Sequence, residues 1–269
     1  MSKTILTLND LHCGSEYGIC PEGLQLQSGS IWPLTEGQKY LLDCWNDLYR
    51  RVKQIGKIDV LILNGDLIEG RQSKQLGTEA FTTDLTVQQE GAIKLLKPFA
   101  EMSEHTYLIR GTEYHDQVSG EALEAVGREL GAEKNVKGRY GRNSLDLVVD
   151  GVTFNVAHRI GVTSGMYRAT LIDKAMLFAA FAKIMKERTG ADVVIRSHAH
   201  FFAHVELVHH HGFITPCWQL QTPYMIRIEP NRMLPDIGAV IIRVDGDMEN
   251  KVFSDKVYYP LPPQEVENV

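Results

Sequence analysis

The sequence predicts an α/β protein built on two β-sheets. In the first half of the chain, short apolar runs alternate with longer segments of helical periodicity, a pattern typical of strands that are joined by helices. In the second half, apolar runs flank short turn signals such as Asp150-Gly151, which is typical of hairpins. No repeat and no Pro- or Ser-rich linker divides the chain. We therefore expect a single domain over residues 1–259, with an insertion or rim loop at 14–33 and a tail at 260–269.

The expected strands of the first half are near-continuous apolar runs, which is typical of strands buried on both faces. They lie at residues 4–8, 59–63 and 105–109, and the expected helices lie at 35–55, 86–102 and 119–130. In the second half we expect strands at 144–149, 152–156, 193–196, 240–244 and 252–258, with one helix at about 166–188.

The composition is that of an ordinary globular chain and excludes several classes of protein. A formal net charge of −6 argues against a broad basic face for nucleic acid, although a local basic patch is compatible with it. The longest apolar run, residues 175–182, is much shorter than the roughly 20 residues that cross a bilayer, and the N-terminus lacks the apolar core of a secretory signal. We therefore expect a cytoplasmic protein with no membrane partner. The four cysteines form no CxxC pair, which predicts reduced thiols rather than a disulfide framework.

Acidic and histidine side chains stand directly after five of the apolar runs. The segments are Asn9-Asp10-Leu11-His12, Asn64-Gly65-Asp66, Arg-Gly-Thr-Glu-Tyr-His-Asp at 110–116, Ala157-His158-Arg159 and Ser197-His198-Ala199-His200. In open α/β sheets, ligands bind outside the carboxyl ends of the strands. We therefore expect these side chains to converge on one site.

The spacing of these residues favours metal binding. In Asp10-x-His12 and His198-x-His200 two side chains stand two positions apart, so in an extended segment both point to the same side. A carboxylate and an imidazole placed in this way can chelate one ion, and a histidine pair can reach one ion or two adjacent ions. The mixed set suits Mn²⁺, Fe or Zn²⁺. Each motif alone is more often a turn or a core residue, but five in this order predict a site for two metal ions.

In their order, these motifs resemble those of the calcineurin-like binuclear metallophosphoesterases, which run Asp-x-His, Gly-Asp, Gly-Asn-His-Asp/Glu, His and Gly-His-x-His. The resemblance spans residues 10–200 and implies a sandwich of two mixed β-sheets with helices on the outer faces. It also implies the metal ligands of this chain: Asp10, His12 and His200 for the first ion, His158 and His198 for the second, and Asp66 as the bridge between them.

Two of the motifs depart from the family pattern. Ser197 replaces a glycine, a change between small residues that should leave ligation intact. The string Gly-Thr-Glu-Tyr-His-Asp at 111–116 lacks the asparagine that ligates the second ion in the family. Alignment on the glycine places Thr112 at that position and alignment on the histidine places Tyr114 there, whereas Glu113 carries the strongest ligand type. We expect Glu113 to supply the missing oxygen, with Thr112, water or substrate as the alternatives.

The resemblance implies a metal-dependent phosphoesterase that hydrolyses a phosphodiester or another phosphate ester. A hydroxide held between the two ions would attack the phosphorus, and His115 would stabilise the developing charge or protonate the leaving oxygen. Arg159, next to a predicted ligand, is the candidate for orienting the phosphate. Manganese is the expected metal, and Fe, Zn, Ni or Mg would also suit the ligands. The variant string at 111–116 further resembles bacteriophage-encoded members, which would place the protein in a host cytoplasm.

Two other functions stay open. A nuclease of the same superfamily would need a surface for nucleic acid, for which the sequence offers one basic cluster that a solvated loop explains as well: Lys134, Lys137, Arg139 and Arg142. A non-catalytic interaction scaffold is the second alternative, and the retention of the ligand set argues against it. The expected partner is a phosphate ester, with a nucleotide or nucleic acid as candidates, and the oligomeric state is not predicted. The histidine run at 209–211 is expected to be a solvated turn.

Overall fold

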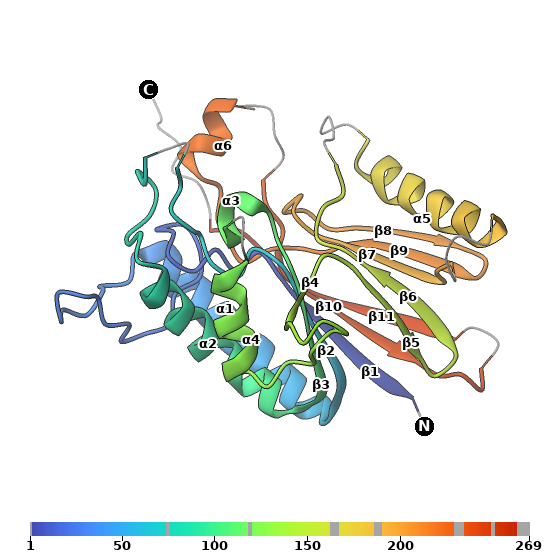
Figure 1. The fold of residues 1–269 in the computed structure, drawn as a ribbon. Helices are drawn as coiled ribbons and strands as arrows, with labels where there is room; N and C mark the ends of the chain where they lie inside the picture. Colours follow the sequence, from blue (N-terminus) through green and yellow to red (C-terminus); the bar gives the residue numbers. More distant parts are fainter. Residues whose placement is uncertain are drawn as a thin grey trace.

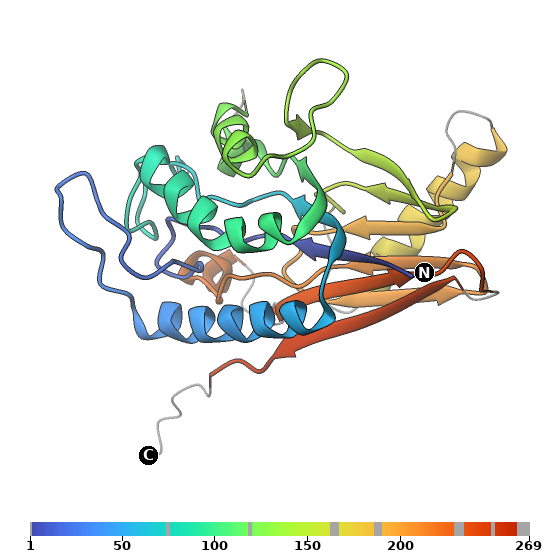
Figure 2. The same ribbon diagram turned by 90° about the horizontal axis from the view of Figure 1, so that it is seen from below.

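Two mixed β-sheets pack face to face, and helices cover the outer face of each sheet (Figure 1). The structure is a computed structural model, and it describes residues 2–73, 76–117, 120–161, 167–185, 190–228, 234–248 and 251–262. The same layers are seen from below in Figure 2, where the helices of the first half lie apart from the single long helix of the second half. The predicted α/β architecture of two mixed sheets with outer helices is confirmed.

The larger sheet has the strand order β11-β10-β1-β2-β3-β4. Its strands are β1 (Lys3–Leu8), β2 (Ile58–Asn64), β3 (Ser103–Ile109), β4 (Gly141–Arg142), β10 (Ile237–Val244) and β11 (Val252–Tyr259). The first four are parallel, whereas β10 is antiparallel to β1 and β11 is antiparallel to β10. Its helices are α1 (Glu36–Ile55), α2 (Leu85–Glu101), the one-turn α3 (Glu113–Asp116) and α4 (Glu121–Glu129). Helix α1 begins where predicted because Thr35 and Gln38 form a reciprocal capping box.

The smaller sheet has the order β5-β6-β7-β9-β8. Its strands are β5 (Leu145–Val149), β6 (Val152–Val156), β7 (Val193–Arg196), β8 (Ala203–Leu207) and β9 (His210–Ile214). Helix α5 (Arg168–Ile184) packs on β7, β8 and β9, and the short helix α6 (Pro223–Ile228) follows the sheet. Strands β6, β7 and β9 are parallel, so their carboxyl ends share one edge of the sheet.

Strand β1 shows why the first strands are apolar on both faces. Ile5 packs between the two sheets with Phe154 and Phe213. Its neighbour Leu6 points to the opposite face and packs under the helices with Trp45. Both faces of the strand are therefore buried, and the expected double burial is confirmed.

Residues 203–214 form a hairpin that the apolar pattern does not predict. Strand β9 lies between β7 and β8, so both edges of its backbone are paired and His211 is only 5% exposed. The turn itself contains residues 208 and 209. The expectation of a solvated turn at 209–211 is therefore wrong for the two histidines that begin β9.

The segment 14–33 is only in part the rim loop that the sequence predicts. Ser15, Ile19 and Cys20 are buried, whereas the tip at residues 25–31 is largely exposed. All four cysteines are free and buried, as expected. Within the described part of the chain, no helix has the length and apolar character needed to cross a membrane. Most of the expected tail, residues 263–269, lies outside the described residues.

Candidate metal centre

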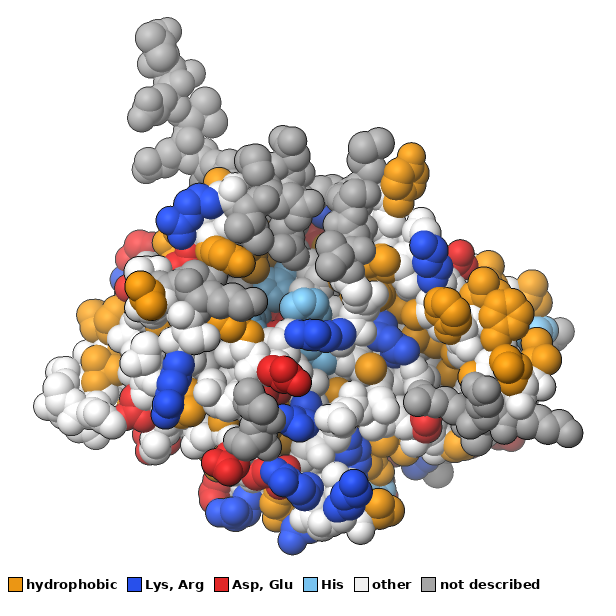
Figure 3. Space-filling view, turned by 45° about the horizontal axis from the view of Figure 1, so that its top comes forward, with side chains coloured by type: hydrophobic (Ala, Val, Ile, Leu, Met, Phe, Trp, Pro, Cys, Tyr) orange, Lys and Arg blue, Asp and Glu red, His pale blue; other side chains and the backbone are white. Residues whose placement is uncertain are grey.

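The carboxyl ends of β1, β2, β6 and β7 bring the predicted ligands together. Asp10 lies in one group with His12 and His200, and in a second group with Asp66, His158 and His198; within each group all ligand atoms lie within 4.8 Å of one another. Histidine side chains are visible at the middle of the face shown in Figure 3, with Lys and Arg side chains around them. The third motif lies beside them, because His115 forms a further group with His12 and Glu69, so the expected convergence of the five motifs is found in the structure.

Asp10 is the residue that the two groups share. Its Oδ2 accepts hydrogen bonds from Asn9 Nδ2 (2.7 Å) and from the backbone N–H of His198 (3.1 Å). Its Oδ1 is buried and has no hydrogen-bond partner among the described residues. This oxygen lies 3.3 Å from His200 Nε2, 3.8 Å from His12 Nε2 and 3.9 Å from His158 Nε2.

A divalent cation fits this arrangement. A buried carboxylate oxygen without a hydrogen bond is costly, and a cation among the surrounding nitrogens would satisfy it. His12 Nε2 and His200 Nε2 lie 3.2 Å apart, close enough to ligate one ion. Asp66, which the resemblance names as the bridge, belongs to one group only, so its bridging role stays a prediction.

Two of the histidines are oriented by acceptors on their other ring nitrogen. His158 Nδ1 donates to the carbonyl of Asn64 (2.7 Å), and because a carbonyl can only accept, Nδ1 carries the proton. His158 Nε2 then faces Asp66 Oδ2 at 3.0 Å. His12 Nδ1 lies 2.8 Å from the buried carboxylate of Glu69, which likewise leaves Nε2 toward the site. Such partners fix ligand orientation and raise ligand basicity.

Glu69 is a functional residue that the sequence motifs do not reveal. It stands three positions after Asp66 in a segment that resembles a turn, and its exposed fraction is 4%. Gln72 Nε2 donates to its Oε1 (2.6 Å), so the carboxylate is held from both sides. In the sequence, the local sign of this role is its position as an acidic residue three positions after the Gly-Asp motif.

The charges of the centre shift the pKa values of its members strongly. Burial alone would raise the pKa values of Asp10 and Asp66, but the nearby imidazoles hold both well below the usual range. Burial alone would lower the pKa of His12, but Glu69 and Asp10 raise it to about 10. In the same way Asp66 and Asp10 raise the pKa of His158 to about 9. In the metal-free protein, protons therefore supply the positive charge that the carboxylates require.

Five of the six predicted metal ligands other than Glu113 have a left-handed rather than an extended backbone, and here the structure corrects the reasoning from spacing. The φ angles are 48° at Asp10, 48° at His12, 48° at Asp66, 71° at His198 and 58° at His200. This left-handed region costs non-glycine residues roughly 1–3 kcal/mol each. The ligands therefore meet through tight turns after the strands, and the tertiary structure maintains the strain.

Two glycines allow the chain segments to approach. A Cβ atom on Gly65, whose φ is +83°, would lie 2.5 Å from His158 Nδ1. A Cβ atom on Gly111 would collide with Asp66, at 2.0 Å from Oδ1. Glycine is therefore needed at both positions.

The variant third motif places a threonine, not the glutamate, beside the ligands. The backbone N–H of Thr112 donates to Asp66 Oδ1 (2.7 Å), and its hydroxyl lies 3.2 Å from the same oxygen. Glu113 begins helix α3, is exposed and belongs to neither ligand group. The first turn of α3 thus places Glu113 outside the two groups, and its role as a ligand stays a prediction. Asp116 is buried, and burial together with the charge of Asp66 raises its pKa to about 8.

The two predicted catalytic residues lie beside the ligand groups. His115 Nδ1 donates to the carbonyl of Glu69 (2.6 Å), and its ring meets that of His12 edge-on at 4.5 Å between centroids. Arg159 is exposed and lines a pocket of about 350 Å³ together with His158, Arg110 and Asn143. Arg159 thus lies at a pocket beside one predicted ligand and His115 lies against another, and their catalytic roles stay predictions.

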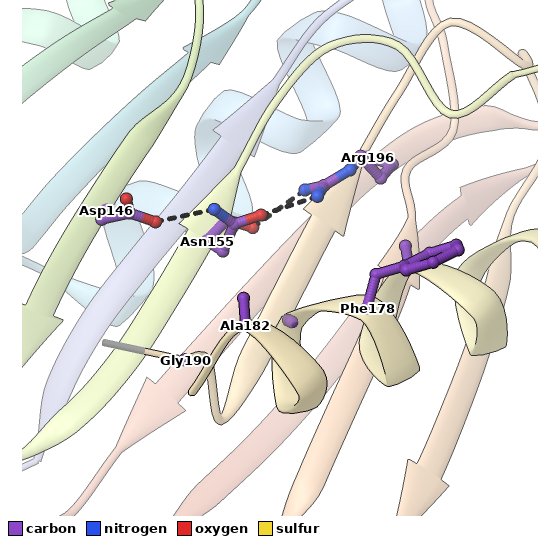
Figure 4. A pocket seen from close by; sticks show the side chains of 8 residues that line it. Asp146, Asn155, Phe178, Ala182, Gly190 and Arg196 are labelled. Atoms are coloured by element: carbon purple, nitrogen blue, oxygen red, sulfur yellow. Dashed lines mark hydrogen bonds between the residues drawn. The ribbon is translucent and has the colours of Figure 1, made fainter. Parts of the chain in front are cut away.

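A second pocket, of about 340 Å³, contains none of the predicted site residues. It lies between helix α5 and the sheet, and its lining includes Phe178 and Ala182 of the helix and Asn155 of the sheet (Figure 4). Asn155 donates to Asp146 (2.6 Å) and accepts from Arg196 (2.6 Å). The polar side chains that line this pocket thus form hydrogen bonds with one another.

The sequence matches no protein-family model and no curated protein. Among solved structures, the chain is similar to vacuolar protein sorting 29 (Vps29) from Cryptosporidium parvum (TM-score 0.47, 9% identity, 96% of this chain and 98% of that chain) and to an archaeal phosphodiesterase (0.43, 11%, 94% and 99%). It is also similar to Vps29 from Entamoeba histolytica complexed with Zn²⁺ (0.38, 10%, 95% and 98%). Identities this low do not carry function, so function is inferred from the side chains of this chain.

Proposed function

We propose that the protein is a metal-dependent phosphoesterase with two divalent ions. The ions, for which manganese is the first candidate and Fe, Zn, Ni and Mg the others, would be held by Asp10, His12, Asp66, His158, His198 and His200. This agrees with the resemblance of the motifs to the calcineurin-like metallophosphoesterases. A bacteriophage origin and a location in a host cytoplasm stay predictions.

The observation that supports this function best is the environment of Asp10 Oδ1. This buried oxygen has no hydrogen-bond partner among the described residues and faces three imidazole nitrogens within 3.9 Å. A structural core would gain stability by replacing such groups with apolar ones, because the desolvation of buried charges is costly. A cation explains why the chain carries them.

The chain orients the groups that the reaction needs. Divalent ions bound here would supply Lewis acidity, which lowers the pKa of water and neutralises charge on phosphoryl oxygens. Glu69 and Asn64 hold His12 and His158 with Nε2 toward the ions. His115 Nδ1 donates to a carbonyl, so its Nε2, when protonated, is free to give a proton to the leaving oxygen.

The pocket beside His158 is the proposed position of the substrate. Arg159 and Arg110 line it, and a guanidinium can bind two phosphate oxygens at once. Glu113 lines the same pocket, so its carboxylate would face the substrate rather than an ion. A phosphodiester, with one negative charge, would be repelled less by this carboxylate than a phosphomonoester.

A specific feature favours a nuclease as the second candidate. The substrate pocket shares Arg110 and Asn143 with a neighbouring hollow of about 630 Å³, which is lined by the predicted basic cluster. Lys134 and Lys137 are exposed there. The two arginines of the cluster are engaged within the protein: Arg139 lies 3.5 Å from Glu124, and Arg142 donates to two carbonyls. A strand of nucleic acid would therefore rely mainly on the two lysines.

The third candidate is a non-catalytic scaffold on the same fold. A scaffold has no use for bound ions or for a strained backbone at the ligand residues. Buried charged groups and left-handed backbone both lower stability, so their presence argues against this function. We test all three functions with protein purified without chelator. Elemental analysis counts the metals, and turnover with Mn²⁺ is compared among bis-(p-nitrophenyl) phosphate, p-nitrophenyl phosphate and single-stranded DNA.

The proposal expects about two metal ions per chain at this centre and faster turnover of the diester than of the monoester. Asp66→Asn should lose these ions and turnover, whereas Asp146→Asn, an exposed aspartate of the other pocket, should keep both. Cleavage of DNA that falls when Lys134 and Lys137 are both replaced by Ala would favour the nuclease. Protein with no metal and no turnover would favour the scaffold and contradict the proposal.

A further inference from the structure

The hairpin β8–β9 carries a second group of metal-binding side chains, apart from the centre described above. His204, Glu206 and His211 each offer a ligand atom, and these atoms lie within 4.8 Å of one another. We propose that the three residues form a separate site for one divalent transition-metal ion such as Zn²⁺. The proposal does not depend on the phosphoesterase function.

The strand register produces the group. Glu206 on β8 is paired directly with His211 on β9, and His204 stands two residues before Glu206 on the same face. Cross-strand neighbours of this kind lie about 5 Å apart at Cβ, which lets both side chains reach one ion. The arrangement therefore follows from regular backbone and needs no unusual loop.

The two imidazoles have the separation that a shared ion requires. His204 Nε2 lies 3.2 Å from His211 Nδ1. Zinc–nitrogen bonds of about 2.0–2.1 Å in a tetrahedron place neighbouring nitrogens roughly 3.3 Å apart. The pair His12 and His200 in the first centre shows the same 3.2 Å.

The surroundings hold these rings in place. His204 stacks on Phe213 with 4.2 Å between centroids and an angle of 11°. His211 is only 5% exposed and stands on β9, which lies between two neighbouring strands. Glu206 is exposed and supplies a negative charge on the solvent side. Two imidazoles and one carboxylate would fill three positions of a tetrahedral ion and leave one for water.

The site lies away from the first centre. The first centre gathers at the carboxyl ends of the parallel strands, whereas His211 stands near the amino end of β9. Strand β8 is the edge strand of its sheet. An ion bound here would fasten this edge strand to its neighbour, which predicts stabilisation of the hairpin by the metal.

The test counts zinc per chain after equilibrium dialysis against Zn²⁺, and records the visible absorption of Co²⁺-loaded protein. Wild type should bind one equivalent more than His204→Ala, and Glu206→Gln should bind this equivalent more weakly. Asp66→Asn should lose zinc from the first centre but keep the hairpin equivalent and its Co²⁺ band. His105→Ala is the matched control, because His105 is an exposed histidine near two carboxylates, Glu133 at 2.9 Å and Glu104 at 3.9 Å, yet belongs to none of the ligand groups of the described residues.

Circular dichroism checks that each variant is folded. If His204→Ala does not fold, Glu206→Gln still tests the proposal, because Glu206 is exposed. In the Asp66→Asn background, zinc should raise the Tm, and addition of Glu206→Gln should reduce this increase. The proposal is overturned if both hairpin variants bind as much zinc as wild type, or if Asp66→Asn binds none.

Discussion

Replacement of Glu69 by glutamine tests how the chain prepares its histidines for metal. Glu69 is 4% exposed, accepts from His12 Nδ1 at 2.8 Å and from Gln72 at 2.6 Å, and interacts with His115 through its carbonyl. Glutamine has nearly the same shape, so the change removes the negative charge and one of the two acceptors. The backbone carbonyl that holds His115 is unchanged.

The expected magnitude follows from two opposing effects on His12. The negative charge of Glu69 stabilises both a proton on His12 and a metal ion bound to His12, and the two compete. A divalent ion carries twice the charge of a proton, so its electrostatic interaction with Glu69 is about twice as large. Removing the charge therefore weakens metal binding more than it weakens protonation, and the net effect is a lower metal affinity. Loss of such a partner typically costs 10–100-fold in metal affinity, or about 1.4–2.7 kcal/mol. In Glu69→Gln, the new side-chain amide replaces a carboxylate oxygen that accepts from Gln72, which should also lower the free energy of unfolding by about 1–3 kcal/mol.

The assay is a Mn²⁺ titration at pH 8 in the presence of a competing chelator, with guanidinium unfolding of the metal-free protein alongside it. Glu113→Gln is the matched control, because Glu113 is exposed and outside both ligand groups, and it should leave metal affinity unchanged. Wild-type affinity in Glu69→Gln would refute the reasoning. So would a loss in Glu113→Gln as large as that in Glu69→Gln, which would return Glu113 to the ligand set.

Four further predictions rest on the same geometry. His115→Ala should keep its metal, as measured by elemental analysis, but its turnover should fall about 10²–10⁴-fold in steady-state kinetics. The loss should be smallest with good leaving groups, which need no proton from an acid. Undiminished turnover would contradict the role of His115 as an acid. Gly65→Ala should destabilise the protein by at least about 1–3 kcal/mol in guanidinium unfolding, because its Cβ would lie 2.5 Å from His158 Nδ1; a wild-type midpoint would contradict this. Because the metal-free pKa values of His12 and His158 are about 10 and about 9, Mn²⁺ binding near pH 8 should release protons, which calorimetry in two buffers detects as different apparent enthalpies. These raised values also stabilise the metal-free fold fully below pH 6.5, and this contribution should be lost as the pH rises through 9 and 10.

The order of strands and ligands was open to prediction from the sequence. Runs buried on both faces must be apolar, and they predict β1 and β2 to within one residue at each end, whereas the hairpin of β8 and β9 is not predicted. Because parallel strands end at a common edge, Asp and His residues placed after them meet in almost any sheet of this kind. The sequence predicts Asp10, Asp66 and His158 in this way, and the structure brings them together.

The partners of the ligands were not open to prediction in the same way. His158 is held by Asn64, 94 positions away, and His12 by Glu69, 57 positions away. The choice between Thr112 and Glu113 depends on the direction of one helical turn, and the ligand backbones are left-handed rather than extended.

The sequence by itself therefore determined the fold class and the residue types of the metal centre, because burial and strand direction act through local pattern. Only the tertiary structure decided that Asp10 faces both ligand groups, that Glu69 supports His12, and that His204 and His211 meet on one hairpin. These are contacts between segments whose register and turns are set by packing, and packing leaves no periodic signal in the chain.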